Sequence, residues 1–243
     1  MRRRSRSRSP GPSSRARPSA GKLYIPLLVT DPVRRAEDSH SVLGERLRQE
    51  RAERGLSLRE LARRLDVSPS LVSQIETGKI QPSVRTLYAM VSELGVSLDE
   101  MFAPAETDAL PSVNARLSAK APVLPETTGD GGLVQRAGER NVIDLEAGVR
   151  WERLTTRNDR EVEFLFTVYP AGSESSPADS LVRHSGREFG IVLTGKLNVT
   201  VGFDDYVLGP GDSVFFESTI PHRLHNEGAQ DVSAVWVVLG RQT

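Results

Sequence analysis

The hydrophobic period of this 243-residue chain changes once along its length, and that change limits the folds open to it. Within residues 41–102, apolar side chains recur at the three- and four-residue spacing of an amphipathic α-helix. Within residues 133–243 they alternate at the period of a β-strand, as in Leu197, Val199 and Val201. We therefore expect a multidomain α + all-β protein, with a helical domain followed by an antiparallel barrel or jelly roll.

Helix starts and stops are clearly marked in the first of these segments. Ser57 and Glu60 have the spacing of a capping box, in which each side chain satisfies a free backbone amide. Ser68 is a favourable helix cap, and Pro69 suits the first turn that follows it. Gly78 is a favourable stop signal. The pattern predicts five short helices in about sixty residues, which makes a compact all-α domain.

Two further segments show neither period. The first twenty residues begin with Arg-Ser repeats and have almost no apolar content to offset chain entropy, and we expect a disordered basic arm over residues 1–40. This arm either contacts nucleic-acid phosphate nonspecifically or is an extension without a role, and the sequence leaves both readings open. Residues 103–132 contain four prolines and a Gly-Gly pair, which predicts an exposed linker.

Overall composition excludes several classes of protein. The chain has no cysteine, so disulfides, thiolate metal sites and cysteine nucleophiles are ruled out. No apolar stretch approaches the length of a membrane helix, and the segment 23–29 is interrupted by Pro26, unlike a signal peptide. We expect a cytoplasmic protein with no membrane partner. Residues 1–102 hold 19 Lys/Arg against 12 Asp/Glu, and residues 103–243 hold 13 against 20, which suggests two modules with different partners.

The helices expected at 58–65 and 69–77 have the proportions of a helix-turn-helix. On the second helix, Val72 and Ile75 would face inward, and Asp66 would occupy the turn between the helices. The outward side chains are short and can hydrogen-bond to base edges in a major groove; they are Ser70, Ser73, Gln74 and Thr77. Pro69 is a further candidate, because the start of the helix lies nearest the bases. Candidates for phosphate contacts are Arg59, Arg63, Lys79 and Arg85.

The charge of this segment does not by itself indicate DNA binding, because residues 41–102 hold nine basic and nine acidic side chains. A small helical interaction domain is the alternative. The stretch Ser-Gln-Ile-Glu-Thr-Gly-Lys at 73–79, within about sixty matching residues, resembles the Cro/CI (XRE) repressor family. In that family the positions matching Pro69, Ser70, Ser73 and Gln74 lie in or beside the major groove. Asp66 departs from the glycine usual there.

The β segment carries a spaced set of metal-ligating residue types. His184 and Glu188 lie four residues apart, and His222 follows Pro221 further along the chain. Two imidazoles and a carboxylate form a facial set that suits Fe(II), Mn(II) or Ni(II), and less well Zn(II). We therefore take His184, Glu188 and His222 as the candidate pocket. We expect Phe216 and Trp236 to pack in the core rather than to contact a ligand.

His184, Glu188, Gly195, His222 and Asn226 together resemble the two motifs of the cupin family over residues 133–243. The first histidine of the cupin motif falls at Val182, so one of the usual four ligands is absent. The remaining three either hold a divalent metal more weakly or hydrogen-bond a polar effector. The resemblance is greatest to cupin domains fused to XRE-type repressors.

These resemblances imply a one-component transcriptional regulator. The helical domain would bind double-stranded operator DNA, and the cupin domain would sense a small-molecule effector, mediate homodimer formation, or both. An effector would act by changing the relative positions of the domains. The alternative is a mononuclear iron enzyme, because some cupins fused to such helical domains resemble an epoxidase of phosphonate antibiotic synthesis. A purely structural dimerisation barrel is a third possibility.

Overall fold

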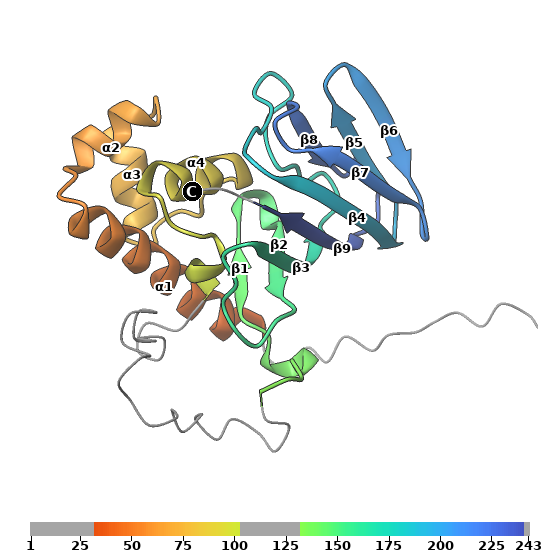
Figure 1. Ribbon diagram of the computed structural model, residues 1–243, viewed down its shortest axis with the longest axis horizontal. Helices are drawn as coiled ribbons and strands as arrows, with labels where there is room; N and C mark the ends of the chain where they lie inside the picture. The colour runs from red at the N-terminus through yellow and green to blue at the C-terminus, as the bar shows by residue number, and fades with distance from the viewer. Residues whose placement is uncertain (1–31, 103–131, 241–243) are drawn as a thin grey trace, which may run out of the picture.

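The computed structural model describes residues 32–102 and 132–240, and it consists of a helical domain packed against a β domain (Figure 1). The helical domain holds four α-helices and a final 3₁₀ helix: α1 (Pro32–Glu53), α2 (Leu58–Arg64), α3 (Pro69–Glu76), α4 (Val84–Leu94) and η1 (Asp99–Phe102). This confirms the expected multidomain α + all-β class. Of the five helices predicted, the last is a 3₁₀ turn rather than an α-helix.

Serine side chains cap three of these helices as the sequence predicts. Ser57, Ser68 and Ser83 each accept a hydrogen bond at 3.1 Å from the backbone amide three residues on. Gly95 follows α4 with φ of 62°, a left-handed backbone that favours glycine. At 57–60, the reciprocal half of the capping box is missing, because the Glu60 carboxylate pairs with Arg63 and Arg64 on the next turn.

Helix α1 is longer at its start than the sequence suggested. It begins at Pro32, so the assignment of residues 32–40 to a disordered arm is wrong. Proline suits the first turn of a helix, and no glycine or proline interrupts the chain from Val33 to Val42. A helix nucleated further along therefore propagates back to Pro32. The rest of the expected arm, residues 1–31, and the expected linker at 103–131 lie outside the described residues.

Asp66 forms the turn between α2 and α3 with φ of 54°. Aspartate tolerates this left-handed conformation better than most residues other than glycine, so the departure from glycine is accommodated without loss of the turn. The backbone amide of Val67 donates to Ala62 at 3.0 Å and closes the connection. The helix-turn-helix geometry is thereby preserved.

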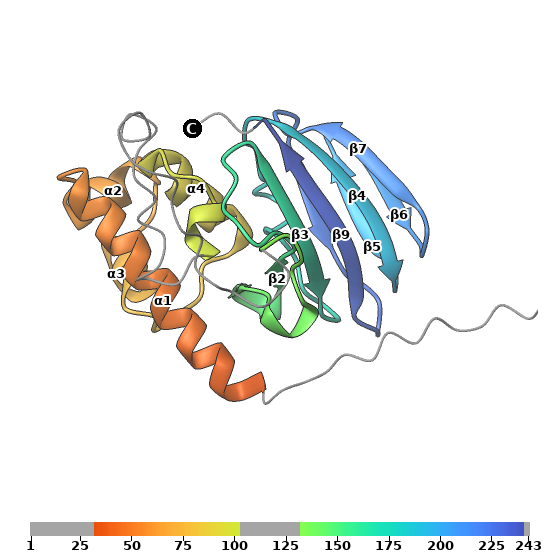
Figure 2. The ribbon, with the colours of Figure 1, turned by 60° about the horizontal axis from the view of Figure 1, so that its bottom comes forward.

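The β domain is built from two antiparallel sheets that face each other, as expected for a cupin-type jelly roll (Figure 2). One sheet has the order β1-β2-β3-β9-β4-β7 and the other β6-β5-β8. The strands are β1 (Val142–Asp144), β2 (Arg150–Arg153), β3 (Val162–Tyr169), β4 (Arg187–Thr194), β5 (Leu197–Val201), β6 (Asp204–Leu208), β7 (Ser213–Glu217), β8 (His222–His225) and β9 (Val232–Leu239). Strands β3 and β9 alternate strictly between buried and half-buried residues.

The two domains share one continuous hydrophobic core, which includes buried residues of the helices and of the strands. Polar contacts flank it: Arg160 pairs with Glu100 at 2.9 Å, and the Asp159 amide donates to the Asp99 carboxylate at 2.8 Å. Burial raises the pKa of Asp99 to about 6, against the opposing effect of nearby Arg153. No helix among the described residues has both the length and the apolar character needed to cross a bilayer.

Candidate nucleic-acid interface and effector pocket

Helix α3 presents a polar face to solvent and an apolar face to the helical core. Val72 and Ile75 are buried, as predicted, whereas Ser73 is half-buried. The other predicted base-contacting residues are exposed: Pro69, Ser70, Gln74 and Thr77. The polar side of α3 is therefore accessible within the described chain.

Local hydrogen bonds distinguish the polar side chains of this face. The Thr77 hydroxyl donates to the Ser73 carbonyl at 2.8 Å, so its proton is already used within the helix. The Gln74 amide nitrogen lies 3.4 Å from the Ser70 hydroxyl, which is a long and weak hydrogen bond. Gln74 is consequently the residue of α3 whose donor and acceptor can turn toward a base edge at the lowest cost.

An ion pair that the sequence analysis did not identify holds α3 in place. Arg51 of α1 donates to the Glu76 carboxylate at 2.6 and 2.8 Å, and to the Leu56 carbonyl at 2.8 Å. Glu76 is buried, and the hydrogen bonds that Arg51 donates to it raise the pKa of Arg51. The bidentate geometry fixes the end of α3 relative to α1 and to the turn that precedes α2.

The predicted phosphate-binding side chains, Arg59, Arg63, Lys79 and Arg85, are all exposed. They are not equally available. Arg63 pairs with Glu60 at 2.8 Å, and the hydrogen bonds from Arg63 and Arg64 lower the pKa of Glu60 to about 2. Arg59, Lys79 and Arg85 form no ion pair with any residue that the structure describes. These three cations are the better candidates for contact with a backbone phosphate.

The structure brings His184, Glu188 and His222 together in the β domain, on the side that faces α4. His184 precedes β4, Glu188 lies on β4, and His222 opens β8. The Nε2 atoms of His184 and His222 lie 3.0 and 3.1 Å from the same Glu188 oxygen, Oε1. All three side chains are almost fully buried, so this predicted constellation forms one compact cluster.

Surrounding groups orient the cluster. The Nδ1 atoms of His184 and His222 lie 2.9 Å from the carbonyls of Ser185 and Ile220, so each ring donates there and directs Nε2 toward Glu188. Trp236 donates its indole N–H to the other Glu188 oxygen at 2.7 Å. The interpretation of Trp236 as core alone is thus incomplete, because it also positions a site residue.

The charge balance of the cluster favours an ionised carboxylate. Burial on its own would raise the pKa of Glu188, but the two imidazoles outweigh it and lower that pKa. Burial likewise opposes protonation of His222, but the adjacent Glu188 carboxylate outweighs it and raises the pKa of His222. A buried anion lying between two imidazoles is a site prepared for positive charge.

The donor geometry fits a divalent metal ion. Glu188 Oε1 is buried and has no aligned hydrogen-bond donor, although both histidine nitrogens approach it. Ligands at about 2.1 Å in an octahedral arrangement lie about 3.0 Å from their neighbours, which matches the two nitrogen–oxygen distances. The ligand atoms of all three residues lie within 4.8 Å of one another. Val182, at the position of a fourth cupin ligand, is buried and lines the pocket with an apolar surface.

The pocket around this cluster is small, and the helical domain forms part of its wall. Its volume is about 20 Å³, which accommodates about one water-sized atom. Tyr88 and Val84 of α4 form part of its wall, beside strand residues that include Trp151 and Leu165. Tyr88 was not identified from the sequence, because its helical spacing beside Leu87 is equally typical of a core residue.

Comparisons with known proteins match both domains. Residues 47–101 match the family model described as helix-turn-helix, and residues 165–238 match the cupin domain model. The HTH-type transcriptional regulator PuuR of Escherichia coli (strain K12) is 27% identical over 187 residues, which span 76% of this chain and 88% of PuuR.

Two solved structures are also similar. An HTH_3 family transcriptional regulator from Vibrio cholerae has a TM-score of 0.54 and 20% identity, over 84% of this chain and 98% of that one. Hydroxypropylphosphonic acid epoxidase from S. wedmorenis has a TM-score of 0.38 and 20% identity, over 84% and 100%. The first likeness shows the same fold, and the second is too low to support an argument about activity.

The fold and the two family matches define a class: proteins that join a helix-turn-helix domain to a C-terminal cupin domain. Within that class, the chain belongs to the XRE-type helix-turn-helix regulators.

A glycine in β4 allows the tryptophan beside the site to pack. A Cβ atom on Gly190 would lie 2.0 Å from Trp236 Cζ3, so the indole would have to move and release Glu188. We expect Gly190→Ala to destabilise the protein by about 3 kcal/mol or more, as forced overpacking does. Thermal or urea unfolding measures this. Gly138→Ala is the matched control, since its Cβ would meet no atom within 4 Å; equal stability of the two variants would contradict the argument.

Proposed function

We propose that this protein is a one-component transcriptional regulator that binds operator DNA through α3 and senses a small molecule in its cupin pocket. The observation that carries the proposal is the exposed polar face of α3, with Gln74 only weakly held, on a helix fixed from behind by the Arg51–Glu76 ion pair. Short polar side chains on a rigid, exposed helix suit direct contact with base edges in a major groove. The regulator family to which the chain belongs supports the same conclusion.

Replacement of Gln74 tests sequence-specific binding. We expect Gln74→Ala to weaken binding to the operator by roughly five- to 150-fold, the effect of losing a bidentate base contact of about 1–3 kcal/mol. Binding to unrelated DNA should change little, because phosphate contacts dominate it. A footprint on DNA upstream of the protein's own gene would locate the operator, and a gel-shift or anisotropy titration would measure both affinities.

Gln230→Ala provides a matched control, since it makes the same substitution at an exposed position of the β domain. This control should retain the full ratio of specific to nonspecific affinity. If Gln74→Ala reduced both affinities equally, Gln74 would not contact bases. If the unmodified protein gave no footprint and no preference among sequences, the regulator proposal would fail.

Homodimer formation is part of this proposal, because helix-turn-helix units gain affinity from two half-sites about one helical turn apart. The outer face of β4 and β7 supports it. Phe189 and Phe215 are paired across the strands with ring centroids 4.9 Å apart, and Ile191 lies beside them. Phe215 is 56% exposed. The charged pair Arg187 and Glu217 borders this apolar face, as at the polar rim of an interface.

Charge placed on this face should separate the subunits. We expect Phe215→Glu to convert a dimer to a monomer and to lower operator affinity about tenfold or more, because the second half-site no longer binds as part of one molecule. Light scattering coupled to gel filtration measures the mass. Phe203→Glu, at the fully exposed hairpin between β5 and β6, should remain dimeric. A dimeric Phe215→Glu protein would place the interface elsewhere.

The three-ligand cluster also supports a second candidate, a mononuclear iron enzyme. His184, Glu188 and His222 fit a facial metal site, and an enzyme of this type would turn over substrate only with iron and oxygen. Metal analysis of protein purified without chelator separates the candidates. Stoichiometric iron with oxygen-dependent turnover would favour the enzyme. Operator protection that persists after metal removal would favour the regulator, in which a divalent metal serves the pocket rather than a reaction.

A further inference from the structure

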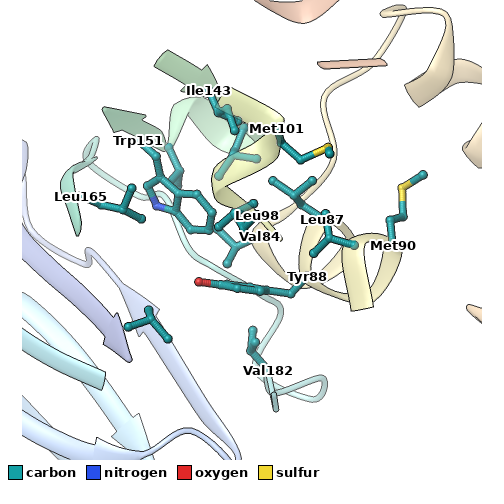
Figure 3. Packing of buried hydrophobic residues seen from close by; sticks show 14 of the residues in the cluster. Val84, Leu87, Tyr88, Met90, Leu98, Met101, Ile143, Trp151, Leu165 and Val182 are labelled. Carbon is teal, nitrogen blue, oxygen red and sulfur yellow. The ribbon is translucent and has the colours of Figure 1, made fainter. Parts of the chain in front are cut away.

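Tyr88 belongs to the DNA-binding domain but lies inside the pocket of the other domain. It projects from α4 and is only 7% exposed. Figure 3 shows its ring reaching between Trp151 and Val182, with the hydroxyl directed toward the strands. The ring stacks on His184 at 4.3 Å with an interplanar angle of 17°, and its hydroxyl donates to buried Glu163 at 3.1 Å. The side chain therefore makes the contacts expected of a bound ligand.

With Tyr88 in this position, the pocket has no room for an organic molecule. The remaining volume of about 20 Å³ corresponds to about one water molecule or one metal ion. A larger ligand must therefore displace part of the wall. Most of the wall belongs to hydrogen-bonded strands, including Trp151 of β2 and Leu165 of β3, whereas Val84 and Tyr88 come from a separate domain. Helix α4 is the part of the wall that can withdraw without breaking a sheet.

We propose that Tyr88 is a built-in occupant of the cupin pocket, and that a pocket ligand regulates DNA binding by displacing Tyr88 and undocking the helical domain. The proposal rests on the function proposed above and identifies how the sensor communicates with α3. The contacts of Tyr88 also define the class of ligand. It is a small planar ring that stacks on His184 and carries a hydroxyl or similar hydrogen-bond donor for Glu163.

Displacement of Tyr88 affects the whole helical domain. The neighbouring residues of α4, Leu87 and Val91, are fully buried in the helical core against which α2 and α3 pack. Helix α4 therefore cannot leave the pocket without moving α3 with it. In a dimer, two docked helical domains present their α3 helices at a fixed separation, and undocking removes that constraint. Ligand binding thus lowers operator affinity.

The same coupling determines how tightly a ligand binds. A ligand that needs Tyr88 withdrawn binds only the undocked fraction of molecules, so its apparent affinity falls in proportion to that fraction. Removal of the tyrosine ring eliminates this competition and leaves a ring-shaped space joined to the existing cavity. Engineered apolar cavities of comparable size bind simple aromatic molecules.

p-Cresol, which reproduces the tyrosine side chain, is the probe for this competition. Titrations followed by calorimetry and tryptophan fluorescence use full-length protein with EDTA, so that metal binding plays no part. We expect Tyr88→Ala to bind p-cresol at least about tenfold more tightly than the unmodified protein, because the competing ring is gone. It should also prefer p-cresol to toluene about tenfold, since toluene lacks the hydroxyl that reaches Glu163.

Tyr88→Phe provides a second test of the competition if Tyr88→Ala does not fold. It retains the ring but lacks the hydrogen bond to Glu163, so the occupant is held less firmly and p-cresol should bind severalfold more tightly than to the unmodified protein. If p-cresol bound the unmodified protein and every folded Tyr88 variant with equal affinity, the proposed competition would be wrong.

The final measurement connects the pocket to domain position. In the unmodified protein, saturating p-cresol should increase the radius of gyration measured by small-angle X-ray scattering and lower operator affinity. In Tyr88→Ala, p-cresol should leave both unchanged, because it fills the space of the missing ring and displaces no part of α4. Tight p-cresol binding without any change in the radius of the unmodified protein would overturn the regulatory step. Scattering needs no DNA, so failure to find an operator would count against the proposed function alone.

Discussion

Helix α4 contributes to two hydrophobic environments at once, and the arrangement of the molecule depends on that double role. Leu87, Val91 and Leu94 close the core of the helical domain, while Val84 and Tyr88 enter the wall of the cupin pocket. Burial of aromatic surface is the largest favourable contribution available to such a contact. It fixes the helical domain beside the β domain (Figure 2). Helix α4 therefore connects the cupin pocket physically to the domain that carries α3.

The exposed face of α3 is kept in order by interactions on its buried side. The Arg51–Glu76 pair connects α3 to α1, and the close approach of Gly44 to the Ile75 carbonyl, 2.4 Å from the place of a Cβ atom, leaves no space between the two helices. A buried ion pair of this kind adds geometric definition more than stability, since desolvation offsets most of its attraction. For a helix that must present side chains to bases, a fixed geometry is the more useful of these two properties.

Local features of the fold could be predicted from the sequence, and long-range ones could not. The caps at Ser57, Ser68 and Ser83 involve groups three residues apart, so spacing alone reveals them. The cluster of His184, Glu188 and His222 followed from motif spacing and a family resemblance. Tyr88 and Glu163 are 75 residues apart, and Trp236 and Glu188 are 48 apart, so only the packing of separate elements brings them together. The start of α1 at Pro32 was missed for another reason, because a helix can extend into a segment with no apolar face of its own.

Val182, which stands where the cupin motif has its first histidine, changes what the pocket can hold. A facial metal site that activates oxygen needs open coordination positions and room for substrate beside them. Val182 offers no donor atom, so it leaves a coordination position open, but the Tyr88 ring stacks on His184 and takes up space in the same pocket. The apolar surface of Val182 suits an aromatic ring far better than a histidine ligand would. The tyrosine from the helical domain, rather than the absent fourth ligand, is thus the feature that favours a pocket that reports occupancy over one that performs a reaction.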